Sequence, residues 1–137
     1  MADAVAPMMQ IGELADRAEM SLRTIRHYDE VGLLVPSGRS DGGFRLYTEA
    51  DFSRLMVIRR MKPLGFSLDE MAELLQVVDA LGSDADLDAG GDEARGGAEH
   101  DIRARLDAFI EQTVERRARL ERQLSMADEF LELLRSR

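Results

Sequence analysis

The amino-acid sequence predicts a mainly α-helical chain, in which four short helices and a small β-hairpin precede one long coiled-coil helix. Three observations carry this prediction. Apolar residues recur at helical spacing behind residues that commonly cap helices. A Gly-Gly pair separates two short extended runs, as in a hairpin. Residues 101–135 contain no proline or glycine, and their apolar residues follow a seven-residue repeat.

The composition limits what this chain of 137 residues can be. With 45% hydrophobic and 33% charged residues it can build a core. Cysteine is absent, which excludes disulfides and thiolate metal sites, so we expect no metal and no cofactor. No apolar stretch approaches the ~20 residues that span a bilayer. Met1 to Gln10 does not resemble a signal peptide, so we expect a soluble cytoplasmic protein with no membrane partner.

The formal net charge of −9 is unevenly distributed. Residues 79–101 hold eight acidic residues and only Arg95, whereas residues 11–66 and 102–137 each carry a net charge of +1. Glycine-rich acidic sequence buries too little apolar surface to offset its ordering entropy. The predicted divisions are a disordered tail (1–8), an N-terminal module (9–81), a flexible acidic linker (82–98), and a dimerisation helix with a short C-terminal segment (99–137).

The module begins with two short predicted helices. The first has an apolar face at helical spacing, formed by Ile11, Leu14, Ala15 and Ala18. Ser21 can cap the second helix, and Gly32 can end it in the left-handed conformation. Two short helices joined by a tight turn indicate a helix-turn-helix. The outward positions of the second helix hold donors suited to phosphates and base edges: Arg23, Thr24, Arg26 and His27.

A hairpin and two further helices follow. The turn Asp41-Gly42-Gly43 lies between two extended runs and is flanked by Arg39 and Arg45. Thr48 and Asp51 can cap a third helix, which Pro63 and Gly65 would end. Ser67 and Glu70 have the spacing of a capping box for a fourth helix. The inner face of that helix is predicted to contain Leu68, Met71, Ala72, Leu75 and Val78.

Each feature alone also has a simpler interpretation. Arginines often lie on the solvated face of a helix, and a Gly-Gly hairpin needs no partner. Arg59, Arg60 and Lys62 suit the negative end of a helix dipole. Tyr28 and Tyr47 could be half-buried core residues. The combined order of helix-turn-helix, basic hairpin and capped helices favours a DNA-binding module.

Four segments in this order resemble the MerR family of bacterial transcriptional regulators: 11–15, 21–34, 43–47 and 64–70. The resemblance covers about 9–80 without gaps. It implies a winged helix-turn-helix, with the hairpin as first wing, followed by an antiparallel coiled-coil dimerisation helix. His27 stands where the family usually has Tyr or Phe, and Asp29 where it usually has Glu.

The resemblance also implies a set of DNA-binding residues. Those on the second helix are Ser21, Arg23, Thr24, Arg26, His27 and Tyr28, with Arg23, Thr24 and Arg26 in the major groove. Those in the first wing are Arg39, Phe44, Arg45 and Tyr47. Arg59 and Lys62 fall before the Gly-Phe turn, in the region that forms a second wing.

The long helix carries two interleaved seven-residue rows of mostly apolar residues, which predict a coiled coil. The expected dimerisation residues are Leu106, Phe109, Ile110, Thr113, Arg117, Leu120, Leu124 and Leu131. Homodimerisation is favoured because symmetric dimers read paired DNA half-sites. The alternative is that the helix folds back onto the N-terminal module.

These features predict a sequence-specific, homodimeric transcriptional regulator that binds double-stranded promoter DNA. The resemblance implies that it distorts the DNA between promoter elements and so acts indirectly on RNA polymerase. The sequence contains no recognisable catalytic motif, so we expect that the protein is not an enzyme. The sequence does not name an effector. Two alternatives remain: an architectural or excisionase-like DNA-bending protein, and a coiled-coil interaction protein without DNA binding. Salt-sensitive DNA binding would argue against the second.

Overall fold

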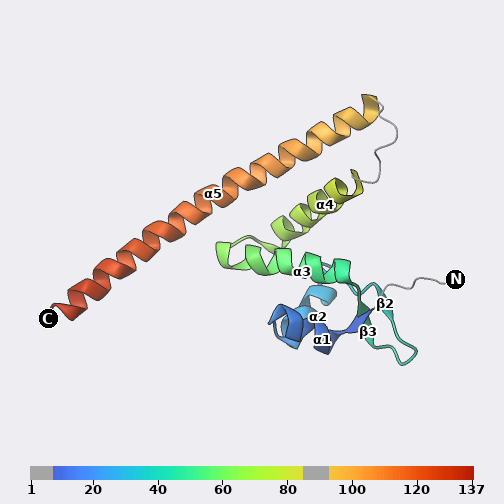
Figure 1. Cartoon of the computed structure of the whole chain (residues 1–137), viewed down its shortest axis with the longest axis horizontal. Coiled ribbons are helices and arrows are strands. Elements are labelled where there is room, and N and C mark those ends of the chain that lie inside the picture. Colours follow the sequence, from blue (N-terminus) through green and yellow to red (C-terminus); the bar gives the residue numbers. More distant parts are fainter. Residues whose placement is uncertain (1–7, 85–92) are drawn as a thin grey trace. The chain divides into compact units, whose positions relative to one another are not determined.

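The computed structural model describes residues 8–84 and 93–137 (Figure 1). The chain divides into two compact units, Met1–Leu75 and Gln76–Arg137, and each is described by itself. Of the tail predicted over 1–8, only Met8 lies among the described residues. The predicted fold class is confirmed: a helix-turn-helix with a small antiparallel sheet precedes a long C-terminal helix.

The helix-turn-helix consists of α1 (Ile11–Ala18) and α2 (Leu22–Glu30). The turn between them passes through Glu19, which has a left-handed φ of 55°. Ser21 caps α2, because its side chain accepts a hydrogen bond from the backbone amide of Thr24 at 3.1 Å. After α2 the chain turns at Gly32, whose φ is 77°. The predicted cap and the predicted stop are both confirmed.

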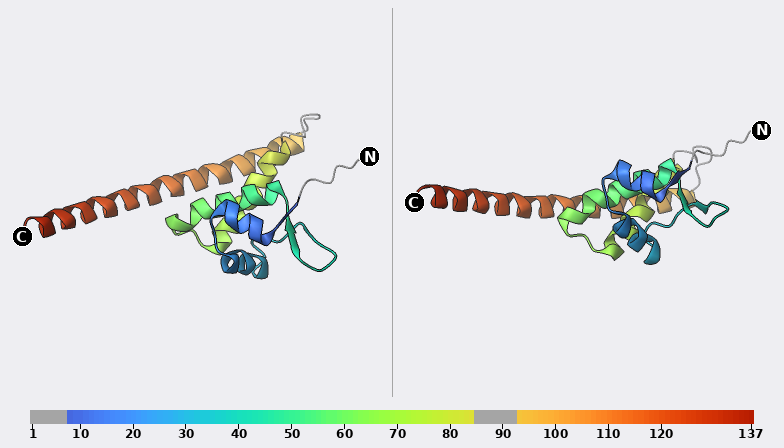
Figure 2. Two further views of the ribbon diagram at one scale, coloured as in Figure 1. Left: turned by 60° about the horizontal axis from the view of Figure 1, so that its bottom comes forward. Right: turned by 90° about the horizontal axis from the view of Figure 1, so that it is seen from below.

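Three short strands form one antiparallel sheet: β1 (Met9–Gln10), β2 (Gly38–Arg39) and β3 (Arg45–Tyr47). Their order is β1-β3-β2, so β3 is the central strand. The predicted hairpin is β2-β3, and its loop projects away from the helices (Figure 2). Strand β1 was not predicted, because two residues are too few to show the alternation of a strand.

The third helix, α3 (Glu49–Met61), begins with the predicted capping box of Thr48 and Asp51. It ends in a 3-10 turn, η1 (Lys62–Leu64), and Gly65 follows with a φ of 83°. The fourth helix, α4 (Leu68–Asp84), begins with reciprocal bonds between Ser67 and Glu70, at 2.8 and 3.1 Å. These boundaries follow from caps and stops that the sequence displays.

The inner face of α4 differs in part from the prediction. Met71 and Leu75 are buried as expected, but Leu68 and Val78 are 39% and 37% exposed. Val77 is buried instead, at 1% exposure. The prediction from helical spacing assumed that the same face of the helix is buried along its whole length. In the structure, the buried face changes after Leu75.

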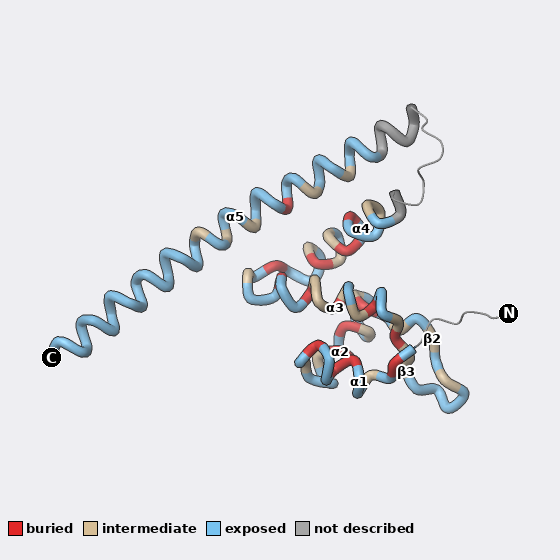
Figure 3. The backbone as a smooth tube through the Cα atoms, viewed as in Figure 1, coloured by how far each residue is buried: buried red, intermediate tan, exposed pale blue. Residues whose placement is uncertain are grey.

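The core of the first unit is aliphatic and forms where α1, α2 and α3 meet. The side chains of Leu14, Ile25, Leu55 and Ile58 are completely buried. Figure 3 shows these buried stretches along the three helices. A surface interaction also joins α1 to α3: Arg17 forms two hydrogen bonds to Glu49 and lies 4.1 Å from the ring centre of Phe52. Because Ile25 of α2 is packed in this core, the opposite face of α2 remains exposed.

The second unit contains the end of α4 and the long helix α5 (Glu93–Arg135). The linker predicted over 82–98 overlaps α4 at its start and α5 at its end, so the segment between the helices is shorter than predicted. Residues 85–92 lie outside the described residues, and their flexibility stays a prediction. In the described part of the chain, no helix has the length and apolar character needed to cross a membrane.

Candidate nucleic-acid interface

The outer face of α2 presents two arginines that no described residue pairs. Arg23, Arg26 and His27 are exposed, and neither arginine forms an ion pair with another described residue. Thr24 is half-buried, and its hydroxyl oxygen accepts a hydrogen bond from the Ser21 hydroxyl at 2.8 Å. Ser21 is therefore occupied in capping the helix, whereas the two arginines keep their donors for a partner.

The inner face of α2 contains Ile25 and Tyr28. Tyr28 is only 4% exposed, and its burial raises the pKa of the phenol. Its ring centre lies 6.3 Å from that of His27, with the two planes inclined at 45°. Tyr28 therefore joins the core to the edge of the exposed face, a position from which only its polar end could reach a phosphate.

Both arginines of the hairpin interact with one acid on α2. Arg45 donates from Nε to Oδ2 of Asp29 at 2.7 Å, and this contact raises the pKa of Arg45. Arg39 lies 3.6 Å from the same carboxylate oxygen and donates a hydrogen bond to the carbonyl of Gly43 at 3.2 Å. The two predicted wing arginines are thus held against α2, a contact that the sequence did not predict.

The tip of the hairpin exposes an aromatic side chain. Phe44 is 63% exposed, while its backbone carbonyl accepts from the Ser40 amide at 2.9 Å and its amide donates to the Ser40 hydroxyl at 3.1 Å. A Cβ on Gly42 would lie 3.1 Å from the Phe44 ring, so glycine permits the ring to lie against the turn. The side chain of the predicted wing residue Phe44 is therefore accessible, while its backbone is held by Ser40.

Tyr47 corrects one prediction. This residue was expected to contribute to DNA binding, but its side chain is completely buried on the central strand β3. Its hydroxyl has no hydrogen-bond partner among the described residues. Tyr47 supports the wing from inside the core, so we do not propose a DNA contact for it.

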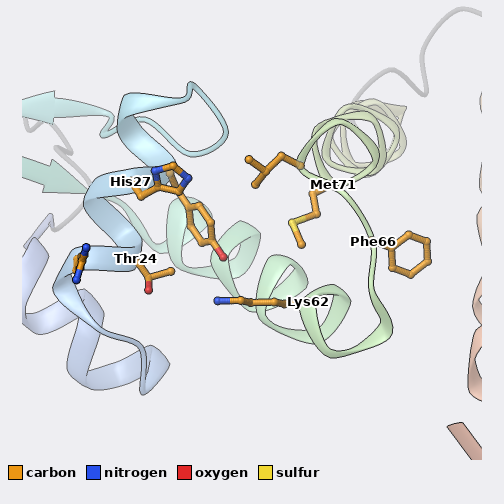
Figure 4. Close-up of a pocket in the computed structure, with 8 residues that line it drawn as sticks. Thr24, His27, Lys62, Phe66 and Met71 are labelled. Carbon is orange, nitrogen blue, oxygen red and sulfur yellow. The ribbon is translucent and has the colours of Figure 1, made fainter.

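A cleft of about 440 Å³ lies between α2 and the turn that leads into α4. Thr24 and His27 on α2 face Lys62 and Met71 across it (Figure 4). The lining includes cations but no acidic residue: Arg23, Thr24, His27, Tyr28, Lys62, Phe66, Leu68 and Met71. The structure therefore brings Lys62 to the exposed face of α2. Arg59, exposed near the end of α3, does not line the cleft.

Three apolar residues of this cleft were missed as site residues. Phe66 and Met71 are buried, at 6% and 3% exposure, and Leu68 is 39% exposed. In the sequence they follow the ordinary pattern of core positions, and no local signal separates a core residue from the wall of a cleft.

The long helix exposes most of its predicted dimerisation residues. Ile110, Leu120, Leu124 and Leu131 are between 42% and 63% exposed, whereas Leu106 is half-buried. Outside the expected dimerisation residues, a second exposed apolar row consists of Met126, Phe130 and Leu133. Its i, i+4, i+7 spacing was visible in the sequence. A helix that exposes this much apolar surface is typical of one that packs against a partner.

The other three expected dimerisation residues of α5 are not exposed apolar side chains. Phe109 is only 6% exposed without any partner chain. Thr113 donates its hydroxyl to the backbone carbonyl of Phe109 at 2.7 Å, so its polar group is satisfied inside the helix. Arg117 lies 3.8 Å from Glu121 in a highly exposed pair. Within the described ranges, no group of three or more metal-ligating side chains is assembled.

Family models match most of the chain. A model described as the MerR helix-turn-helix family of regulatory proteins matches residues 9–77, and one described as MerR, DNA binding, matches residues 52–128. The transcriptional regulator ZntR of Escherichia coli K12 is 49% identical to this chain over 70 residues. That match covers 51% of this chain and 50% of ZntR, so the chain spans about half the length of this curated relative.

Solved structures extend the similarity to the long helix. HiNmlR, described as a MerR family regulator lacking the sensor domain and bound to promoter DNA, is 25% identical with a TM-score of 0.58. The match covers 93% of this chain and 85% of HiNmlR. PbrR691 of Ralstonia metallidurans CH34, solved in complex with lead(II), is 32% identical with a TM-score of 0.50, covering 93% and 86%. The similarity therefore includes both units.

Proposed function

Because this chain belongs to the MerR family of helix-turn-helix transcriptional regulators, we propose that it binds promoter DNA as a homodimer and regulates transcription. The observation that carries the proposal is the pair of exposed arginines on α2, Arg23 and Arg26, which have no ion pair among the described residues. Unpaired guanidinium groups on a rigid helix are the donors that read guanine edges and bind phosphates. The family is one of regulators rather than enzymes, as the sequence predicts.

In this proposal α2 enters the major groove, and its neighbours hold the phosphate backbone. Arg23, Thr24 and Arg26 lie on the face of α2 that reaches the bases. Arg39, Arg45 and Phe44 contact the backbone from the hairpin. Lys62, His27 and Tyr28 contact it from the cleft, and Arg59 from the end of α3. The acid-free lining of the cleft supports this assignment, because a nearby carboxylate would repel a phosphate.

The proposed dimer forms through α5. Its exposed apolar residues would be covered by α5 of a second copy, so that two helix-turn-helix modules face two half-sites. Members of this family distort promoter DNA, and we propose the same action here. Binding both half-sites would bend and twist the DNA between the promoter elements, and RNA polymerase would respond to the changed DNA shape.

The test is selection of duplexes from a random library by the full-length protein, followed by footprinting and transcription in vitro. We expect an enriched pseudo-palindrome and an affinity that falls steeply with salt. A promoter that carries this site in its spacer should change its transcript level when the protein is added. Binding and bending without any change in transcription would favour an architectural role. The absence of any enriched site or salt-sensitive binding would refute the proposal.

A further inference from the structure

Asp29 occupies an unfavourable position in its own helix. It lies in the last turn of α2 (Leu22–Glu30), where the helix dipole disfavours negative charge. Its side chain is only 14% exposed, so part of its hydration is lost as well. A carboxylate at such a position points to an interaction outside the helix, and its partners are the two arginines of the hairpin.

Those arginines would repel each other without Asp29. Arg39 and Arg45 are directly opposite in the β2-β3 register, where like charges destabilise a strand pair. Oδ2 of Asp29 lies 2.7 Å from Nε of Arg45 and 3.6 Å from Arg39. One carboxylate therefore offsets the repulsion across the hairpin and attaches both strands to α2.

The contact orients the arginines but does not use all of their donors. Arg45 uses Nε for Asp29, and Arg39 uses one terminal nitrogen for the Gly43 carbonyl. Each guanidinium has five N–H donors, so several remain for a phosphate. The side chains of Arg39 and Arg45 are still 52% and 26% exposed.

From this geometry we infer that Asp29 is a positioning residue that sets the preference of this protein for specific over non-specific DNA. The inference rests on the proposed DNA-binding function. Asp29 fixes the wing arginines in one orientation relative to α2, so that they meet phosphates only when α2 is seated in its own site. It also cancels positive charge that would otherwise attract any duplex, because non-specific binding depends on uncompensated cations.

The test compares Asp29→Asn with Glu30→Gln in the full-length protein. Asn keeps the shape of Asp29 and removes its charge. Glu30 is the next residue of α2 and is exposed, so its change removes the same charge without breaking the contact with Arg45. Affinities are measured for the duplex selected by the unchanged protein and for a scrambled duplex, over a series of salt concentrations.

For Asp29→Asn we expect the ratio of specific to non-specific affinity to fall about fivefold to tenfold, the size typical of one misplaced contact. Its affinity for the scrambled duplex should rise, with a log–log salt dependence steeper by about 0.9 for each cation released. Glu30→Gln should keep the ratio within about twofold. An unchanged ratio in Asp29→Asn, or an equal fall in Glu30→Gln, would overturn the inference.

Asp29→Glu separates positioning from a purely structural role. It keeps the negative charge beside Arg45, so we expect a ratio close to that of the unchanged protein. A fall as large as that of Asp29→Asn would show that a negative charge beside Arg45 does not preserve the preference, which also overturns the inference. Thermal unfolding of all variants identifies loss of fold. If the unchanged protein selects no duplex, the proposed function itself fails, and that result is distinct from an unchanged ratio.

Discussion

The Ser37 hydroxyl donates a hydrogen bond to Oδ2 of Asp51 at 2.5 Å, and this contact joins the loop before the hairpin to the start of α3. Asp51 is 2% exposed. The same Oδ2 accepts from the Thr48 amide at 2.9 Å, and Oδ1 accepts from Arg54 at 3.1 Å. One buried carboxylate therefore caps a helix and holds a loop, which makes it a sensitive point of the first unit.

Replacement of Asp51 by Ala should lower the free energy of unfolding by about 2–3 kcal/mol, because a helix cap and a buried charge-assisted bond are lost together. Urea unfolding followed by circular dichroism measures this change. Asp41→Ala, in the exposed hairpin loop, is the control and should stay within about 0.5 kcal/mol. Equal effects of the two changes would contradict the assigned role of Asp51.

Replacement of Tyr47 by Phe should be neutral or should stabilise the protein by about 1 kcal/mol, since the buried hydroxyl has no partner among the described residues. Burial also raises the pKa of Tyr47. The folded state therefore holds the proton of the phenol more tightly than the unfolded state does. The contribution of this difference to the free energy of unfolding is complete below the ordinary tyrosine pKa of about 10 and is lost as the pH rises above it.

Unfolding curves at neutral pH and in alkali check the expected effect of Tyr47→Phe. The stability of the unchanged protein should fall above about pH 10, and Tyr47→Phe should lessen that fall. Tyr28→Phe is the comparison, because burial raises the pKa of Tyr28 as well. A marked loss of stability in Tyr47→Phe at neutral pH would mean that the hydroxyl makes a bond after all.

Substitutions at two glycines in open space allow the effect of backbone conformation on stability to be measured apart from the effect of packing. A Cβ at either Gly32 or Gly12 would meet no atom within 4 Å, but only Gly32 has a positive φ, of 77°. Gly32→Ala should therefore destabilise by about 1–2 kcal/mol. Gly12→Ala, inside α1, should stabilise by about 0.5–1 kcal/mol. Thermal unfolding gives both values, and shifts of the same sign would disprove the assignment of Gly32 as a conformational stop.

Arg26→Ala should weaken binding to the selected duplex by about 1–3 kcal/mol, because an exposed guanidinium of α2 would lose its contact with a base or a phosphate. Fluorescence anisotropy with labelled duplex measures the affinity. Arg60→Ala removes the same charge from the same unit at a position outside the proposed interface, and it should have a smaller effect. Unchanged affinity in a folded Arg26→Ala variant would refute the placement of α2 in the groove.

The double replacement Leu120→Asp with Leu124→Asp should convert the proposed dimer to monomers, because it places two charges among the exposed apolar residues of α5. Sedimentation equilibrium measures the mass. Ala104→Asp with Ala108→Asp adds the same charges at exposed positions on other faces of the helix and should leave the dimer intact. A dimer that survives the leucine changes would assign the interface to another surface.

Local signals predicted most of the fold. The side chains of Ser21, Thr48 and Ser67 each accept a hydrogen bond from the backbone amide three residues later. Because this contact is local, the helix starts could be predicted from the sequence. The burial of Tyr47 and the contact between Asp29 and Arg45 depend on residues that meet only after folding. Neither the spacing of residues nor the composition of the sequence predicts such long-range contacts. For that reason the sequence could not show that the side chain of Tyr47 lies inside the core.

The sheet gives the hairpin a mechanical connection to the helices. Strand β3 pairs with β1, which continues directly into α1, and Tyr47 at its end is followed by the cap of α3. A load on the hairpin tip is therefore carried through β3 to the starts of α1 and α3 at once. If DNA binds against the hairpin as proposed, we expect any strain in the duplex to act on both helix starts together.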